Sequence, residues 1–160
     1  MTKVDLLYAL KEFTTSVYAG MVLPCKPDST ESERGVQVFL THLPTTSASA
    51  KFAPYVIHSI ITGEDGQNEG EDERAYAVVR TIFCTYDKDE EQGGLALLTL
   101  AERLRIELLR KRVLANRFQL ELPKSPMQLL VYPDNTAPFY VAETSSTWRI
   151  PAVEREVNYG

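Results

Sequence analysis

The acidic residues after Tyr86 are the part of the chain that comes nearest to a metal-binding motif. The run Asp87-Lys-Asp-Glu-Glu-Gln-Gly has carboxylates at the first and third positions of an EF-hand calcium loop. Gln92 stands where that loop needs glycine, and Leu98 stands where it needs a bidentate glutamate. The pattern therefore excludes an EF-hand. A weaker cation site on the acidic segments stays open as one alternative.

Histidine and cysteine supply neither a ligand set nor a nucleophile. His42 and His58 have no cysteine or second histidine at ligand spacing, so we expect each to be a half-buried strand residue. Cys25 and Cys84 lie far apart, form no CxxC pair and have no sequence context typical of a nucleophile. We expect both to be reduced thiols with no metal role.

Serine and glycine motifs give no catalytic signal either. The chain has no G-x-S-x-G motif for an activated serine. Gly93-Gly94 precedes a predicted helix and could bind an anion, but Asp89, Glu90 and Glu91 would repel a phosphate. We therefore expect no catalytic residue, no cofactor and no enzymatic activity.

A second acidic segment, Gly63–Glu73, lies on the other side of an apolar stretch. Its acidic residues are Glu64, Asp65, Glu69, Glu71, Asp72 and Glu73. Residues 63–73 are predicted to be the acidic loop of a long hairpin, whose ends lie at a boundary with another subunit or partner. The alternative is a loop that is acidic only because it is solvated.

Composition places the chain among ordinary folded proteins. It has 160 residues, of which 44% are hydrophobic and 24% charged, which predicts a single domain over 1–160. The net charge of −5 argues against nucleic acid as the main ligand. Asp5 interrupts the place of a signal peptide's apolar run, and no apolar stretch approaches the length of a membrane span. We expect a soluble protein made in the cytosol, with no membrane partner and no sequence-specific nucleic acid binding.

Helices are predicted at Thr2–Ala19 and Leu95–Ala115. Thr2 is a candidate N-cap with Asp5 three positions on, and Gly93-Gly94 opens the longer helix. The longer helix has a main apolar stripe of Leu97, Leu100, Ala101, Leu104 and Leu108, and a second stripe of Leu98, Ile106, Leu109 and Val113. Because one stripe is enough for a surface helix, the second predicts contact with another molecule. The basic residues Arg110, Lys111, Arg112 and Arg117 end the helix.

Strands are predicted over most of the remaining chain. They are Val36–His42, Tyr55–Thr62, Arg74–Tyr86, Phe118–Leu122, Met127–Tyr132, Phe139–Glu143 and Ser146–Ile150, with a polar loop at Pro24–Gly35 and a connector at Thr45–Lys51. The strand Arg74–Tyr86 is apolar on both faces, which predicts a central strand covered on both sides. Trp148 should be a buried anchor whose indole N–H has a partner. The order of elements predicts an α+β fold, with a mainly antiparallel sheet packed against the long helix and the N-terminal helix.

The order of several short segments resembles the tail terminator (tail completion) proteins of long-tailed bacteriophages. These segments are Ala53-Pro-Tyr-Val-Ile, the acidic insertion, Thr85-Tyr-Asp, Gly93-Gly94 opening a helix, Ile106-Glu-Leu-Leu-Arg, and Trp148-Arg-Ile-Pro-Ala-Val-Glu-Arg-Glu. The resemblance covers most of the chain from about residue 54 onward. It implies an α+β domain that forms a hexameric ring on the head-proximal end of the tail tube, stops tube growth and offers a surface to the head-side connector.

The resemblance also implies the partners. The partners would be other copies of the chain, the tail tube protein and the head-side connector protein, assembled in the bacterial cytoplasm. Independently of the resemblance, acidic segments at Glu64–Glu73 and Asp87–Glu91 and a basic helix end at Arg110–Arg117 suggest a head-to-tail contact between copies, and the expected interface includes Asp87, Asp89, Arg110, Lys111 and Arg112. Ile106, Leu109 and Val113 would add apolar contact. A head-completion or neck connector protein and a small acidic cation-binding module remain the alternative functions.

Overall fold

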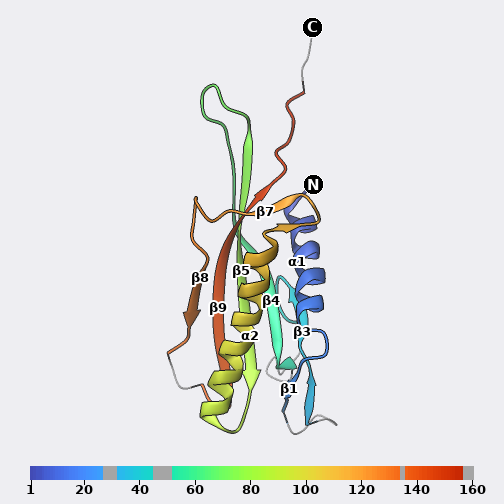
Figure 1. Cartoon of the computed structure of the whole chain (residues 1–160), viewed down its shortest axis with the longest axis vertical. Coiled ribbons are helices and arrows are strands. Elements are labelled where there is room, and N and C mark those ends of the chain that lie inside the picture. Colours follow the sequence, from blue (N-terminus) through green and yellow to red (C-terminus); the bar gives the residue numbers. More distant parts are fainter. Residues whose placement is uncertain (27–31, 45–51, 134–135, 157–160) are drawn as a thin grey trace.

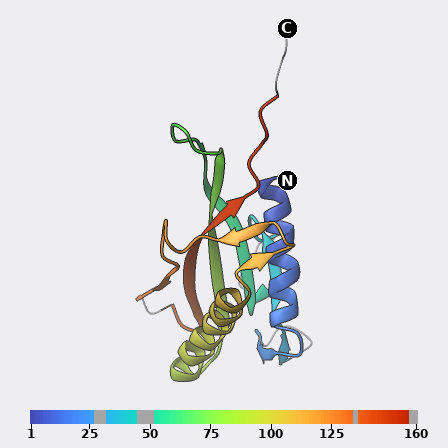
Figure 2. The ribbon, with the colours of Figure 1, turned by 45° about the horizontal axis from the view of Figure 1, so that its top comes forward.

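A twisted, mainly antiparallel sheet forms the centre of the fold, and helices α1 (Lys3–Val17) and α2 (Glu90–Lys111) cover one of its faces (Figures 1 and 2). The computed structural model describes residues 1–26, 32–44, 52–133 and 136–156. In this part of the chain the strand order is β3-β4-β5-β9-β7-β6, with β8 also paired to β9. The predicted α+β fold with a long helix, an N-terminal helix and a mainly antiparallel sheet is confirmed.

The strand bounds are as follows. The main sheet contains β3 (Gln37–Leu40), β4 (Tyr55–Gly66), β5 (Arg74–Tyr86), β6 (Val113–Leu114), β7 (Phe118–Leu120), β8 (Gln128–Val131) and β9 (Phe139–Ile150). Strands β1 (Val22–Pro24) and β2 (Glu33–Gly35) form a separate antiparallel pair. The predicted polar loop Pro24–Gly35 therefore begins and ends in strand structure, and the predicted connector Thr45–Lys51 lies outside the described residues.

Helix α1 starts as its sequence predicts. The backbone N–H of Asp5 donates to the Thr2 hydroxyl at 3.3 Å, and the Thr2 backbone N–H donates to the Asp5 carboxylate at 2.7 Å. This reciprocal capping box occupies two of the donors that an N-terminal helical turn leaves without partners. The helix ends at Val17, and the chain then turns through Gly20, which has a φ of 80°.

Helix α2 begins earlier than predicted. Asp89 is its N-cap and accepts hydrogen bonds from the backbone N–H groups of Glu91 and Gln92, so Gly93 and Gly94 lie inside the helix. The prediction that the glycines open the helix is wrong, because an aspartate cap with acidic residues in the first turn starts a helix well. All residues of the predicted main stripe, from Leu97 to Leu108, are buried.

The hairpin of β4 and β5 is longer than predicted. Its antiparallel register runs from Tyr55 paired with Cys84 to Gly66 paired with Arg74. The predicted loop 63–73 is therefore too long, since Glu64 and Asp65 lie on β4 and only residues 67–73 connect the strands. Strand pairing outweighed the low strand propensity of glycine and acidic residues here.

Strand β9 joins two predicted strands into one. It pairs with β5 from Ala75–Ile150 to Tyr86–Phe139 without interruption, so the predicted break between Glu143 and Ser146 is wrong. The prolines at 138 and 151 lie just outside the strand and bound it rather than divide it.

Burial differs between the two faces of β5. Ala75, Ala77, Val79 and Phe83 belong to the core beneath the helices, together with Trp148, which is 0% exposed. The indole N–H of Trp148 donates to the Ser146 hydroxyl at 2.9 Å, as predicted. The opposite face, which we call the outer face, has half-buried side chains at Tyr76, Val78, Arg80 and Ile82. The prediction of cover on both sides is wrong for this face from Tyr76 to Ile82, while Cys84 and Tyr86 at its far end are buried within the chain.

Candidate functional site

Two of the titratable groups inside the fold, His58 and Cys84, are buried. His58 is fully buried, and its ring nitrogens lie 2.8 Å from the hydroxyls of Thr14 on α1 and Thr81 on β5. Burial lowers the pKa of His58 to about 3 and raises the pKa of the Cys84 thiol to about 11, so both groups stay neutral near pH 7. The predicted half-buried positions are wrong for both histidines, because His42 is exposed just after β3.

No metal-binding cluster is present in the part of the chain that the structure describes. No group of three or more His, Cys, Asp or Glu side chains comes close enough there to hold an ion. Within the same residues, no helix is long and apolar enough to cross a membrane. The remaining candidate sites are surfaces, and the predicted interface residues lie on four of them.

The first surface is the projecting end of the β4–β5 hairpin, residues 61–74, which we call the arm (Figure 1). It carries the exposed residues Glu64, Asp65, Glu69, Glu71, Asp72 and Glu73. The backbone hydrogen bonds of paired strands hold it out from the body. The arm therefore presents carboxylates well beyond the helices.

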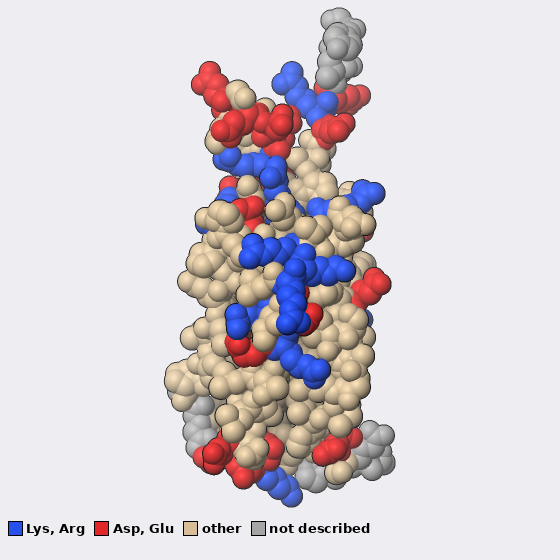
Figure 3. All heavy atoms as spheres, viewed as in Figure 1, with Lys and Arg blue, Asp and Glu red and all other residues tan. Residues whose placement is uncertain are grey.

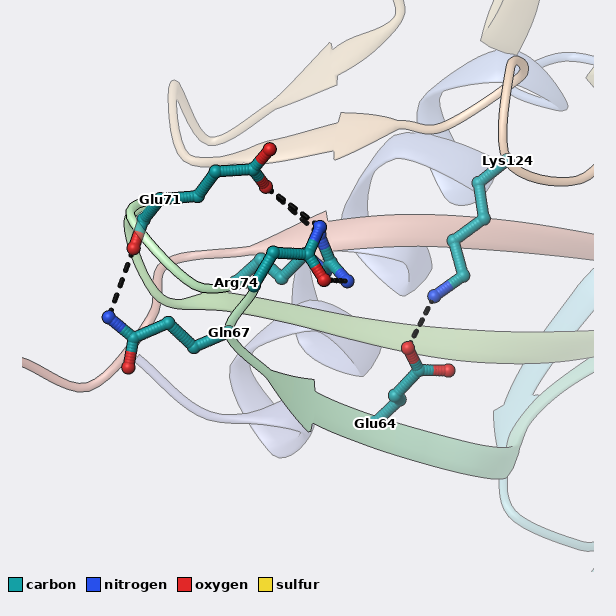
Figure 4. Close-up of polar contacts among 6 residues, drawn as sticks. Glu64, Gln67, Glu71, Arg74 and Lys124 are labelled. Carbon is teal, nitrogen blue, oxygen red and sulfur yellow. Dashed lines mark hydrogen bonds and ion pairs between the residues drawn. The ribbon is translucent and has the colours of Figure 1, made fainter.

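Lys124, from the loop between β7 and β8, contacts the arm where it leaves the body. Its ammonium lies 2.7 Å from the Glu64 carboxylate (Figure 4) and 4.0 Å from the centroid of the Tyr76 ring. Glu64 and Tyr76 are cross-strand partners, so one cation contacts both strands of the arm. The hydrogen bond from Lys124 lowers the pKa of Glu64. Lys124 is thus a brace for the arm.

The connection at the end of the arm has its own polar contacts. The Asn68 amide donates to the Glu71 carboxylate at 2.8 Å, and the Arg74 guanidinium donates to the Asn68 carbonyl oxygen at 3.0 Å. The Gln67 side chain donates to the Glu71 backbone carbonyl at 3.0 Å (Figure 4). These contacts order the turn. They also neutralise part of its charge, since Glu71 and Arg74 form an ion pair at 3.5 Å.

The second surface is the acidic segment of residues 87–91, which lies at the opposite end of β5 from the arm. Figure 3 shows acidic side chains at both ends of the long axis and basic side chains between them. Asp87 accepts a hydrogen bond from the Asp89 backbone N–H at 3.0 Å, and Asp89 caps α2. The structure therefore does not bring Asp87 and Asp89 together with the carboxylates of the arm, and it gives both residues a part in starting the helix.

The third surface is the basic end of α2. Arg110 pairs with Glu107 at 2.8 Å, and the Lys111 ammonium lies 6.0 Å from the centroid of the Phe13 ring. Arg112 is the C-cap, has a φ of 59°, and donates from Nε to the Leu109 carbonyl at 3.1 Å. Cations at this position are favourable because the last carbonyls of a helix carry partial negative charge.

The fourth surface is an apolar strip on α2 that points away from the sheet, which we call the outer stripe. Its members are Leu95, 51% exposed, Leu98, 39% exposed, and Ile106, 41% exposed. Leu109, from the predicted second stripe, is half-buried and touches the core, and Val113 lies beyond the helix on β6. The predicted second stripe therefore exists as exposed surface, but only its Leu98 and Ile106 lie plainly on it.

A groove on the outer face of the sheet was not predicted. It has a volume of about 780 Å³ and is lined by Ile61, Val78, Arg80, Leu129, Leu130 and Glu143, among others. Strand β8 forms one wall, and all its residues are exposed. Arg80 and Glu143 pair at 2.6 Å, and the Tyr132 hydroxyl lies 3.2 Å from the same carboxylate oxygen. We call this feature the outer groove.

Sequence reasoning missed the brace at Lys124 and the outer groove. Lys124 stands in a proline-bounded turn, where nothing in the sequence marks a partner that is 60 residues away. The groove did have a signal, since the run of Leu129, Leu130 and Val131 lacks the polar alternation of a strand with one solvated face.

Comparisons with known proteins identify a shared fold. No family model matches the sequence, and no curated protein matches it. A solved structure whose name states no function aligns with a TM-score of 0.50 and 10% identity, over 97% of this chain and 99% of that chain. A chain from the "Virion of native gene transfer agent (GTA) particle" aligns with a TM-score of 0.41 and 11% identity, over 90% of each chain.

The first of these likenesses shows that the chain shares a known α+β fold over nearly its whole length. At 10% identity it says nothing about activity. The second is below the similarity at which two folds count as the same. The chain is thus an α+β protein whose candidate sites are exposed surfaces.

Proposed function

We propose that the chain is a structural virion protein that caps the tail tube of a long-tailed phage as a hexameric ring. In this role it ends tube polymerisation and offers a surface for attachment of the head. It would lie at the head-proximal end of the tail, with the tube protein and the head-side connector as its partners. The resemblance of its segment order to tail terminator proteins is the first support.

The observation that carries the proposal is the pair of exposed apolar surfaces on opposite sides of one chain. The outer stripe lies on α2, and the outer groove lies on the face of the sheet that the helices leave open. Exposed apolar side chains that lie together on one surface support a contact with another protein. Two different surfaces suit a heterologous contact, which repeats from copy to copy and closes into a ring when the rotation allows it.

The distribution of charge supports separate roles for the ends and the sides. The arm and the Asp87–Asp89 segment lie at opposite ends of the long axis, with basic side chains between them (Figure 3). In a ring whose axis follows the long dimension, the two acidic ends would face the layers above and below. The predicted acidic residues at the two ends would then meet the tube on one side and the head-side connector on the other.

Tail tubes assembling in vitro provide the test. We expect added protein to stop tube growth and to be seen by electron microscopy at one end of each tube. Ile106→Asp is the comparison variant, because it alters the outer stripe at an exposed position. Tubes that lengthen at an unchanged rate, with no protein at their ends, would refute the proposal.

A further inference from the structure

We propose that the outer stripe of α2 in one copy lies in the outer groove of the next copy, with the basic end of that helix beside the base of the neighbour's arm. This inference rests on the ring of the proposed function and names the two surfaces that would form it. The occupant of the groove is therefore a second copy of this chain.

The positions of the two surfaces lead to a contact that repeats. Helix α2 packs on the core face of the sheet through residues such as Leu100 and Leu104, while the groove opens on the outer face at Val78 and Arg80. One copy can therefore use its helix for one neighbour and its groove for another. A contact between unlike surfaces leaves neither surface open once a ring closes.

The charged groups named on both surfaces are already paired within the chain. In the groove, Arg80 binds Glu143 at 2.6 Å. On the outer stripe, Glu102 stands between Leu98 and Ile106, and both its oxygens accept from Arg105, at 2.9 and 2.7 Å. Covering these surfaces would therefore desolvate ion pairs but would leave neither pair with an uncompensated charge, which costs more. An apolar occupant with its own paired charges fits this groove.

The lengths of α2 and β5 determine how far along the long axis the basic end of α2 and the acidic base of the arm lie. Helix α2 has 22 residues, which makes it about 33 Å long. Strand β5 rises by about 3.3 Å per residue, so about ten residues of β5 span the same length. Tyr86 ends β5 near the start of α2. Tyr76 lies ten residues before Tyr86 on β5, and its cross-strand partner is Glu64. The end of α2 and the base of the arm are therefore about level, and Figure 1 shows both toward the same end.

Ring symmetry preserves this level between neighbours. When the ring axis follows the long dimension, adjacent copies run parallel, so the basic end of one α2 reaches the level of its neighbour's Glu64 and Asp65. Arg110, Lys111 and Arg112 would then face acidic side chains of the arm. Charges matched in this way favour one register of the helix in the groove over others. They also oppose the antiparallel arrangement, which would place the basic helix end away from the arm.

Two variants of the full-length chain test the inference. Ile106→Asp puts a charge on the outer stripe, and Leu130→Asp puts one in the groove at a side chain that is 54% exposed. Both positions are exposed, so neither change removes a core residue. Val4→Asp, at a position 57% exposed on α1 and outside both surfaces, is the matched control. Circular dichroism confirms that each variant keeps its helices.

Association is measured by sedimentation velocity and native mass spectrometry, at low salt and high protein concentration. We expect wild-type protein and Val4→Asp to form rings, and each of the other variants alone to remain at 18.0 kDa. An equal mixture of Ile106→Asp and Leu130→Asp should form a one-to-one dimer and nothing larger. In that dimer the intact groove of the first variant meets the intact stripe of the second.

Four results would overturn the inference: rings from Leu130→Asp, rings from Ile106→Asp, a mixture that stays monomeric, or monomeric wild-type protein. Rings from Ile106→Asp together with monomers of Leu130→Asp would indicate pairing along the edge of β8 instead. The tube-capping test is separate. Protein that associates as inferred but leaves tube growth unchanged would refute the proposed function and leave this interface standing.

Discussion

A methyl group added at Gly93 should destabilise the protein, while the same change at Gly94 should stabilise it. Both glycines lie inside α2, where alanine is favoured over glycine by about 0.5–1 kcal/mol. At Gly94 no atom lies within 4 Å of an added Cβ, so the gain is kept. At Gly93 the Cβ would lie 2.1 Å from Cε2 and 2.5 Å from Cδ2 of the Tyr140 ring on β9.

The expected size follows from that close approach. A Cβ at 2.1 Å from a ring carbon requires the ring or the helix to move, and overpacking of this kind costs about 1–3 kcal/mol. The gain in helix propensity offsets part of the cost, so Gly93→Ala should lose about 0.5–2 kcal/mol. For a chain of this size about 1 kcal/mol corresponds to about 2–4 °C in Tm. We expect Tm to rise by a few degrees for Gly94→Ala and to fall by a few degrees for Gly93→Ala.

Thermal and urea unfolding, followed by circular dichroism, measure both variants. A double-mutant cycle with Tyr140→Ala isolates the contact, because Gly93→Ala should become neutral or stabilising once the ring is gone. Equal stabilisation by the two alanine variants would refute the reasoning. So would a cost of Gly93→Ala that persists without the ring, since the close approach of α2 to β9 at this point would then not be its cause.

The remaining predictions concern pH, the arm and salt. Burial lowers the pKa of His58 to about 3, below its unfolded value of about 6.5, so protonation favours the unfolded chain. The free energy of unfolding should therefore not depend on His58 well above pH 6.5. Below pH 6.5 it should fall by up to about 1.4 kcal/mol per pH unit toward pH 3. Urea melts at several pH values test this against His58→Gln, and an equal acid slope in both proteins between pH 6.5 and 5 would contradict it. Lys124→Met should speed hydrogen exchange and proteolysis of residues 61–74, because the Lys124 ammonium lies 2.7 Å from the Glu64 carboxylate. The control is Lys88→Met, at an exposed lysine away from the arm, which should leave both rates unchanged. Unchanged exchange in the arm would show that the brace does not hold it. Salt should shift a monomer–ring equilibrium toward monomer, because it screens exposed charge pairs between the arm and the helix end; assembly that requires added calcium would instead favour a cation-triggered contact.

Local sequence signals were enough for the two helices, for β5 and for the buried side of each, but not for every element boundary. The capping box of Thr2 and Asp5, the bounds of β5 and the buried stripe of α2 all follow from residues within a few positions of one another. The same holds for the burial of Trp148. Local hydrogen bonds and the 3.6-residue or two-residue period act over that range, so they can be recognised without the fold.

The candidate sites were only partly predictable, because they depend in part on contacts between residues that are far apart in the sequence. The exposed Leu98 and Ile106 could be found from the helical period, since one stripe already accounted for the core. The separation of Asp87 and Asp89 from the arm also follows from the predicted strand Arg74–Tyr86, because 13 extended residues at about 3.3 Å each hold the two acidic segments apart. The part of Lys124 in bracing the arm depends on a contact between residues that are 60 positions apart.

The outer groove shows the same division within one feature. The apolar run at Leu129 and Leu130 is visible in the sequence, and it indicates a strand that is not solvated on either side. Which surface those side chains line depends on the pairing of β8 with β9 and of β9 with β5, across Ser145 and Arg80. Residue types and spacing thus determine which side chains are apolar or charged and which residues can cap a helix. Long-range strand pairing settles which of them share a surface, because the chain entropy lost in bringing distant residues together is offset only by the complete sheet.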